Sequence, residues 1–183
     1  FWNPAVYTRL PKDRTPRHYE EGTFYATNVI TDYAIDFIDQ AHQKKKPLFL
    51  YLAYNAPHFP LHAPKEVTDK YMSLYMQGWD KIRDARWKRI VDLKLMQGKP
   101  ALSPRGVVPE SLFEDETHPL PAWDSLTKDQ QTDLARRMSI FAAMVDVMDA
   151  NIGRVVDELK KNGELDNTFI MFMSDNGACA EWH

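Results

Sequence analysis

The sequence lacks several features that would define a compartment or a class of site. Its only cysteine is Cys179, which excludes an internal disulfide and a cysteine-rich zinc site. No apolar run reaches the roughly 18 to 20 residues that a membrane-spanning helix needs. The chain starts at Phe1 without an initiating Met or a signal-like segment, and it ends abruptly at His183. We therefore expect no membrane span, leave the compartment open and interpret the chain as a fragment of a longer protein.

An excess of positive charge is also lacking. The 23 Lys and Arg residues are mixed with 26 Asp and Glu residues, for a net charge of −3, so charge gives no reason to expect nucleic-acid binding. A hydrophobic content of 44% and an aromatic content of 12% are sufficient for a buried core and argue against disorder. We expect residues 1–183 to form part of one globular domain, whose oligomeric state the sequence does not indicate.

A helix followed by a buried strand is predicted in the first third of the chain. Apolar residues recur at helical spacing from Thr27 to about Lys46. Pro47 ends this helix, and residues 48–54 form a nearly continuous apolar run, which is typical of a strand buried on both faces. Residues 55–64 contain three prolines, so we expect a stiff, irregular loop at the end of that strand.

Further helices and a second strand are predicted downstream. Residues 65–77 and 80–96 have helical patterns, whereas residues 97–122 have no periodicity and are interpreted as a surface loop excursion. A Thr-x-x-Gln capping box at Thr127 begins a long helix that Gly163 ends. Its predicted apolar stripe consists of Leu134, Met138, Phe141, Val145, Met148, Ile152, Val155, Val156 and Leu159.

Residues 168–173 form the second apolar run and are predicted to be a strand. The alternation of helices and strands indicates an α/β layered fold with a mostly parallel central sheet flanked by helices. Two strands are too few for a complete sheet of this type. We therefore expect the fold to be incomplete in this fragment.

Polar residues follow both predicted strands, where open α/β sheets bind ligands. Asp175 offers a carboxylate and Asn176 a carbonyl oxygen, which suits calcium or magnesium, and Gly177 permits a tight turn. An ordinary Asp-Asn-Gly turn explains the same residues. After the first strand, His58 lies between Pro57 and Pro60. Its imidazole is a candidate for proton transfer or anion binding, and an ordinary loop histidine is the alternative.

Other polar residues are weaker candidates. His62 is assigned to loop structure, and a zinc pair with His58 is disfavoured because the prolines prevent the helix that would align both rings. Ser103 lies beside Arg105 but has no identifiable base, so a loop turn is the better interpretation. Cys179 has no neighbouring feature that lowers a thiol pKa, and we expect it to be non-catalytic.

Four ordered stretches carry a resemblance to a known family. They are residues 24–34 with Phe24-Tyr25-Ala26-Thr27, residues 50–61 with Asn55-Ala56-Pro57-His58, residues 142–154 with Asn151-Ile152-Gly153-Arg154, and residues 165–177 with Ser174-Asp175-Asn176-Gly177. Together they resemble the sulfatase family, and bacterial arylsulfatases within it, over essentially the whole chain. The resemblance implies an alkaline phosphatase-like fold and a sulfuric ester hydrolase that is periplasmic or secreted.

The resemblance also implies roles for particular residues. Asp175 and Asn176 correspond to a pair of calcium ligands, and His58 corresponds to the histidine that contacts the sulfate and the leaving-group oxygen. The family's nucleophile is a formylglycine, made from the first residue of a Cys/Ser-x-Pro-x-Arg motif that does not occur here. We therefore expect the nucleophile outside this chain, and we expect the fragment alone to be inactive.

The sequence leaves alternatives open for both the substrate and the reaction class. The ester can be a small aryl sulfate or a sulfated carbohydrate. A phosphate or phosphonate monoester hydrolase of the same superfamily would use similar metal ligands, and a sulfatase-like protein without catalysis would only bind sulfated glycans or a partner. An intact nucleophile motif in the parent sequence would separate the enzymes from the binding protein.

Overall fold

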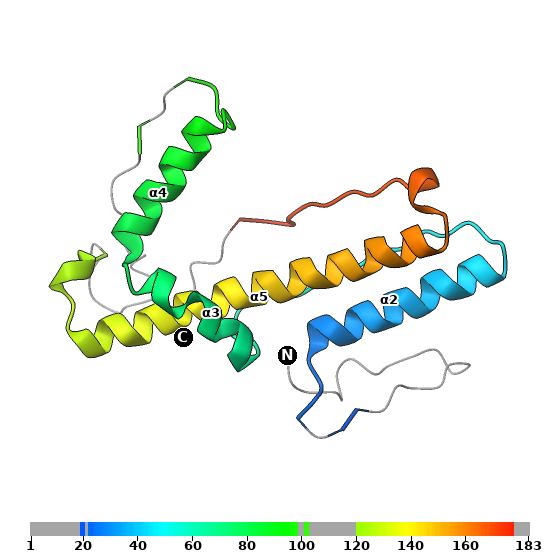
Figure 1. Ribbon diagram of the computed structural model, residues 1–183, viewed down its shortest axis with the longest axis horizontal. Coiled ribbons are helices and arrows are strands. Elements are labelled where there is room, and N and C mark those ends of the chain that lie inside the picture. The colour runs from blue at the N-terminus through cyan, green and yellow to red at the C-terminus, as the bar shows by residue number, and fades with distance from the viewer. Residues whose placement is uncertain (1–18, 21, 99–100, 103–119, 178–183) are drawn as a thin grey trace. The chain divides into compact units, whose positions relative to one another are not determined.

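The computed structural model describes residues 19–20, 22–98, 101–102 and 120–177 (Figure 1). Its helices are α2 (Ala26–Gln43), α3 (Lys65–Tyr75), α4 (Trp79–Asp92) and α5 (Lys128–Lys161), with short 3-10 helices η2 (Trp123–Ser125) and η3 (Leu165–Asn167). None of the helices in these ranges is long and apolar enough to span a membrane.

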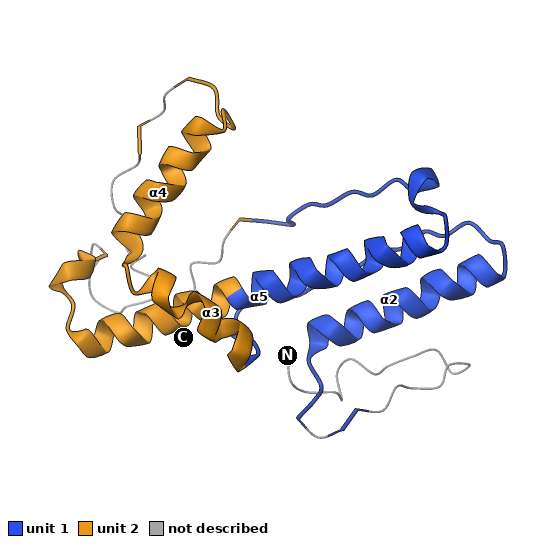
Figure 2. Ribbon diagram, in the orientation of Figure 1, with its two compact units in different colours: residues 1–64, 143–176 blue, residues 65–142, 177–183 orange. Residues whose placement is uncertain are grey.

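The chain divides into two compact units (Figure 2). The first unit contains residues 1–64 and 143–176, and the second contains residues 65–142 and 177–183. Helix α5 contributes to both units, because the division falls between Ala142 and Ala143.

The first unit has its core along α2. Helical spacing places Ala26, Val29 and Tyr33 on one face, where they cluster with Phe24, and Tyr19 and Phe37 pack against this cluster. The predicted helix is confirmed, but it ends before the lysine run. Gln43 is its last residue, and Lys45 already has a positive φ of 51°.

Helices α2 and α5 run side by side in the same direction in this unit, joined by a row of polar contacts (Figure 1). Asn151 donates from Nδ2 to Asn28 Oδ1 at 2.8 Å, and Arg154 pairs with Asp32 at 2.5 Å. Farther along, Asn162 Nδ2 donates to Asp39 Oδ1 at 3.2 Å, and His42 Nδ1 lies 2.9 Å from Glu164 Oε1. These contacts align the pair along most of the length of α2.

The start and end of α5 agree with the sequence. The Thr127 backbone N–H donates to Gln130 Oε1 at 2.9 Å, and the Gln130 backbone N–H donates to Thr127 Oγ1 at 3.3 Å. This reciprocal pair is the predicted capping box. After Lys161, Gly163 has a φ of 71°, the left-handed conformation common just after a helix.

The apolar stripe predicted for α5 coincides only in part with its buried face. Five of the buried positions recur every four residues and form the row Ala135, Ser139, Ala143, Val147 and Asn151, and Met144 is buried as well. Among the predicted stripe residues Leu159 is buried and six others are partly buried, whereas Phe141 is 42% exposed and Val145 is 38% exposed. Three of the five residues in the buried row are Ala or Ser, and such small side chains allow close approach of neighbouring backbone.

The two predicted strands are extended but unpaired. Residues 48–54 and 168–173 contain no residue assigned to a strand, and the same holds for the rest of the described chain. Phe49 is 94% exposed and Phe169 is 86% exposed. A strand requires hydrogen-bonding neighbours along its edge, and neither segment has them here. The central sheet therefore stays a prediction.

The second unit is organised around Trp123, which is 4% exposed. Its ring meets that of Trp79 edge to face, with centroids 5.0 Å apart, and its backbone N–H donates to Asp80 Oδ2 at 3.1 Å. Gly78, between α3 and α4, lies directly against the indole, so that a Cβ at this position would be 2.3 Å from Cγ of Trp123. Most of the predicted excursion 97–122 lies outside the described residues.

Candidate functional site

His58 lies in the irregular loop that the prolines predicted, and its side chain is exposed. The His58 backbone N–H donates to the Asn55 carbonyl at 2.9 Å. The imidazole Nδ1 lies 2.6 Å from the Phe59 carbonyl oxygen. Because a carbonyl can only accept, Nδ1 carries the proton of this hydrogen bond. Nε2 is then the ring nitrogen that can accept a proton or, in the charged ring, donate one.

Two hydrogen-bonded hydroxyl groups, one of them on α2, connect the N-terminal end of this loop to that helix. Thr31 is fully buried, and its hydroxyl donates to the Thr27 carbonyl at 3.0 Å. Its oxygen lies 2.7 Å from the Tyr54 hydroxyl, which is therefore the donor of that hydrogen bond. Burial raises the pKa of Tyr54, although the Thr31 contact and the Arg154 charge act in the opposite direction. Tyr54 thus remains a protonated donor at neutral pH.

The C-terminal end of the loop is held by a second tyrosine. The Tyr25 hydroxyl donates to the His62 backbone carbonyl at 2.8 Å. Tyr25 is 1% exposed, and burial raises its pKa, which keeps the hydroxyl protonated. The first turns of α2 therefore hold the chain on both sides of His58. The Phe24-Tyr25-Ala26-Thr27 stretch is recognisable in the sequence. Its role in holding the loop is visible only in the structure.

His62 differs from His58 in its surroundings. It is partly buried, and this burial lowers its pKa below the ordinary value of a histidine. The ring is therefore neutral at physiological pH. His62 lies in the loop, as predicted, and the chemical role of His58 stays a prediction.

Asp175 and Asn176 follow the second extended segment, and both are exposed. The Ser174 hydroxyl donates to the Asn176 backbone carbonyl at 2.7 Å, which forms a local turn. No group of three or more His, Cys, Asp or Glu residues that could hold a metal exists within the described ranges. A carboxylate and an amide oxygen are the kind of ligands that calcium prefers, but calcium takes six to eight of them. These two residues fit the ion in chemistry and require further oxygen ligands.

The structure does not join these candidates into one site. In the part of the chain that is described, no hydrogen bond or ion pair links His58 to Asp175 or Asn176. The weaker candidates Ser103 and Cys179 lie outside the described residues. The features that the structure adds are the tyrosine contacts, because they depend on residues that are distant in sequence.

Comparisons with known proteins agree on one family. The family model described as Sulfatase matches residues 1–181. An uncharacterized sulfatase of Schizosaccharomyces pombe is 41% identical over 177 residues, covering 96% of this chain and 29% of that protein. An arylsulfatase of Klebsiella aerogenes is 34% identical over 139 residues, covering 76% of this chain and 27% of that protein.

A carbohydrate-directed enzyme is also among the relatives. An N-acetylglucosamine-6-O-sulfatase of Bacteroides thetaiotaomicron is 28% identical over 200 aligned residues, covering 88% of this chain and 36% of that protein. This chain therefore spans between 27% and 36% of the length of these three relatives.

Proposed function

The chain belongs to the sulfatase family, and we propose that the protein containing it hydrolyses sulfate esters with His58 acting on the ester oxygen. The observation that carries the role of His58 is the 2.6 Å contact between its Nδ1 and the Phe59 carbonyl. This contact fixes the tautomer and orients the ring, so Nε2 is presented to solvent on an exposed loop. A protonated Nε2 can donate to the alkoxide or phenoxide as the ester bond breaks.

The contacts of Tyr25 and Tyr54 support this role for His58. A general acid must stay within hydrogen-bond reach of the leaving oxygen, and a displacement of about 1 Å can cost on the order of 100-fold in rate. The two tyrosine hydroxyls restrain the loop on either side of His58 at 2.8 Å and 2.7 Å. The loop is thereby held to buried residues at the start of α2 even though the imidazole itself is exposed.

Asp175 and Asn176 complete the proposal as oxygen ligands of one calcium ion. When bound, the ion supplies positive charge to the sulfate oxygens. Asp175 contributes a charged ligand and Asn176 a neutral one, and the remaining ligands come from residues outside this chain. A formylglycine outside this chain is the proposed nucleophile, so this chain alone is expected to be inactive.

The family implies an alkaline phosphatase-like α/β fold. Within the proposal, residues 48–54 and 168–173 are parallel strands of its central sheet in a single catalytic domain. Their exposed aromatic side chains, Phe49 and Phe169, support this assignment because both faces of such strands are normally covered. Pairing would also satisfy the backbone of both segments.

Both small aryl sulfates and carbohydrate sulfates are candidate substrates. The names of the Klebsiella and Bacteroides relatives support one class each. Two alternatives to sulfate hydrolysis remain, namely hydrolysis of phosphate or phosphonate monoesters and binding of sulfated glycans without catalysis. The test is to assay the complete protein on matched sulfate and phosphate monoesters with and without calcium. Phosphate turnover without sulfate turnover would replace the proposed function, and no turnover of either would favour the binding protein.

The role of His58 is tested with a leaving-group series in the complete protein. We expect His58→Ala to slow substrates with poor leaving groups by about 100- to 10,000-fold and nitrophenyl sulfate much less, because nitrophenolate needs little protonation. His58→Gln is the matched variant, since it retains a hydrogen-bond donor but has no titratable proton. An equal loss across the series would show that His58 binds the sulfate instead. Loss of bound calcium would make it a metal ligand.

A further inference from the structure

A groove in the second unit has no role in the site described above. It lies between the end of α3 and one side of α4 and has a volume of ≈ 390 Å³. Seven residues line it, namely Leu74, Gln77, Lys81, Ile82, Ala85, Arg86 and Arg89. Three of the seven are cationic and none is acidic. The groove is therefore locally positive in a chain whose net charge is −3.

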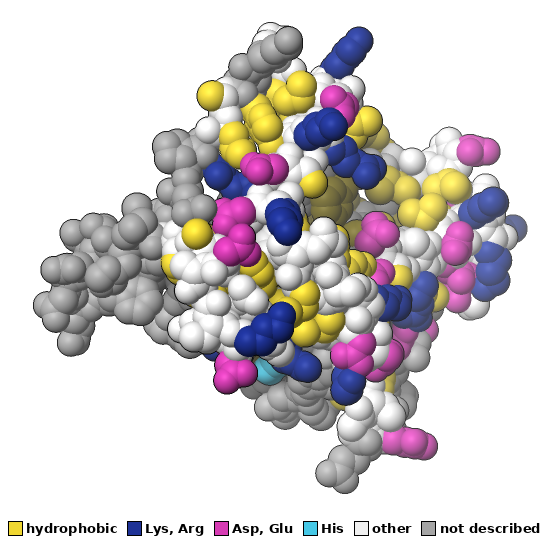
Figure 3. Space-filling model, turned by 60° about the vertical axis from the view of Figure 1, so that its left-hand side comes forward, with side chains coloured by type: hydrophobic (Ala, Val, Ile, Leu, Met, Phe, Trp, Pro, Cys, Tyr) yellow, Lys and Arg dark blue, Asp and Glu magenta, His cyan; other side chains and the backbone are white. Residues whose placement is uncertain are grey.

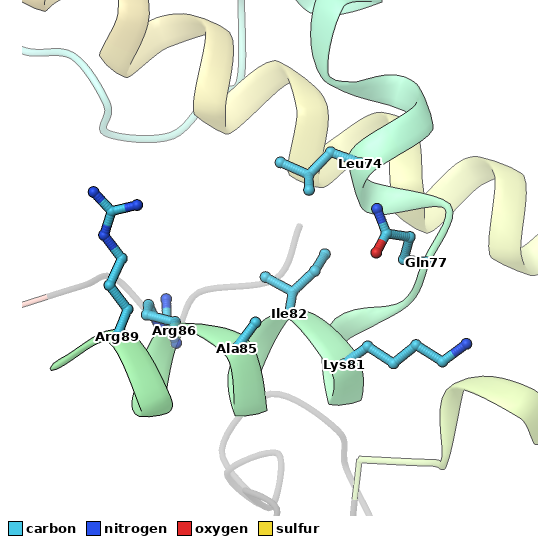
Figure 4. A pocket seen from close by; sticks show the side chains of 7 residues that line it. All are labelled: Leu74, Gln77, Lys81, Ile82, Ala85, Arg86 and Arg89. Atoms are coloured by element: carbon cyan, nitrogen blue, oxygen red, sulfur yellow. The ribbon is translucent and has the colours of Figure 1, made fainter. Parts of the chain in front are cut away.

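The cations of this groove are spread along it. Lys81 and Arg89 lie at opposite ends, and their side chains point away from each other (Figure 4). Eight residues of helix separate them, which corresponds to about 12 Å along the axis. A single small anion is best bound by cations that converge on it. Cations in a row fit a ligand that carries several anionic groups along its length.

All three cations are available to a ligand. Lys81, Arg86 and Arg89 are exposed, and within the described ranges none of them forms a hydrogen bond or ion pair. Other basic residues are neutralised within the chain, as Arg137 is by Asp133 at 2.9 Å. Arg86 and Arg89 are also three residues apart on one helix, where like charges repel each other. An anionic ligand would relieve this repulsion.

The base of the groove is apolar. Leu74 of α3 and Ile82 of α4 point toward each other between the two ends (Figure 4). The C–H faces of a sugar ring can lie against such side chains while charged substituents reach the cations. The Arg guanidinium presents paired donors that match the oxygens of a sulfate group.

We propose that this groove between α3 and α4 binds a sulfated carbohydrate chain through several of its sulfate groups. The choice of ligand rests on the proposed sulfatase function, since sulfated carbohydrates are one of its two candidate substrate classes. Nucleic acid, another polyanion, is less favoured. On the face shown in Figure 3, Lys and Arg side chains are interspersed with Asp and Glu instead of forming a broad basic surface.

The test measures equilibrium binding of a fluorescein-labelled heparin octasaccharide to the complete protein at about 0.1 M salt, where surface charges are screened beyond about 10 Å. We expect Arg86→Gln/Arg89→Gln to weaken binding by about 10-fold. Lys81→Gln should give a smaller loss in the same direction. The control Lys88→Gln/Arg136→Gln removes the same charge from exposed residues that do not line the groove, and it should change binding by less than about 2-fold.

Three outcomes would overturn the proposal. They are equal losses in the two double variants, equal binding of the desulfated octasaccharide, and equally tight binding of a single-stranded DNA oligonucleotide of the same charge. Thermal unfolding of each variant establishes that it is folded before its binding is compared. This experiment measures binding and does not require turnover. The hydrolysis of nitrophenyl sulfate tests the proposed function separately, so failure of the groove proposal can be told apart from failure of the proposed function.

Discussion

Replacing Tyr25 with Phe removes one oxygen atom from the structure and tests how the His58 loop is held. The ring is 1% exposed and would remain in place, so the substitution creates no large cavity. The change removes the 2.8 Å hydrogen bond between the tyrosine hydroxyl and the His62 carbonyl, and it also removes the contact of the hydroxyl with Thr27. The His62 hydrogen bond is the one that leads to the His58 loop.

The expected loss of stability follows from that hydrogen bond. A typical intramolecular hydrogen bond contributes about 1 kcal/mol, and removing one partner of a buried pair costs about 1–3 kcal/mol. We expect Tyr25→Phe to lower the free energy of unfolding of the complete protein by about 1–2 kcal/mol. The control is Tyr75→Phe, because Tyr75 lies on α3 in the second unit and its hydroxyl forms no hydrogen bond within the described residues, and its effect should stay within about 0.5 kcal/mol.

The pH dependence gives a second, independent readout. Burial raises the pKa of Tyr25 in the folded protein above its ordinary value of 10.0. The folded state therefore keeps this proton at a pH where the unfolded chain loses it. The resulting stability is fully present below about pH 10 and is lost as the pH rises toward the folded pKa. Tyr25→Phe should lose less stability than the wild type above pH 10.

The assays are denaturant unfolding at several pH values and turnover of a poor-leaving-group sulfate ester. A looser loop should lower kcat more than it raises KM, because His58 is proposed to act on the ester oxygen in the transition state. If Tyr25→Phe matched Tyr75→Phe in both stability and turnover, the Tyr25 hydroxyl would not hold the loop. A loss of stability with unchanged kcat would show that the contact is structural and does not position His58.

The remaining predictions concern the metal ligands, the unpaired segments and the turn before α4. In the complete protein, Asp175→Ala should remove most of the bound calcium and of the activity. Asn176→Ala should have a smaller effect, because only Asp175 carries charge. A wild-type metal content in Asp175→Ala would exclude the assignment. This chain expressed alone should self-associate through its two extended apolar segments, and a monomer with one sharp unfolding transition in analytical ultracentrifugation and calorimetry would contradict this. Gly78→Ala should destabilise the protein by at least about 2 kcal/mol, since its φ is 89° and a Cβ would be 2.3 Å from the Trp123 ring; unchanged unfolding would show that the indole can move.

Local sequence patterns were sufficient for the helices. Apolar residues recurring at helical spacing from Thr27 located α2, and the Thr127 capping box located the start of α5. These features depend on neighbours within one or two turns, which a sequence displays directly. The Sulfatase family was also identifiable, because its motifs are contiguous stretches of sequence.

The buried face of α5 was not predictable in the same way. Large apolar residues such as Phe141 indicated the stripe, yet the buried row contains Ala135 and Ser139. Hydrophobicity ranks side chains by their transfer from water, whereas burial in a helix contact also depends on how closely the backbones approach. A close approach of two backbones requires small side chains such as those of Ala and Ser, to which hydropathy gives little weight.

The sequence by itself determined the position of His58 in a proline-rich loop and of Asp175 and Asn176 after an apolar segment. Only the tertiary structure showed that Tyr25 and Tyr54 hold this loop to α2, and that Nδ1 of His58 is engaged by a backbone carbonyl. The physical reason is the range of the interactions. A hydrogen bond between residues 25 and 62 depends on how a helix and a loop pack, and no local pattern records that packing.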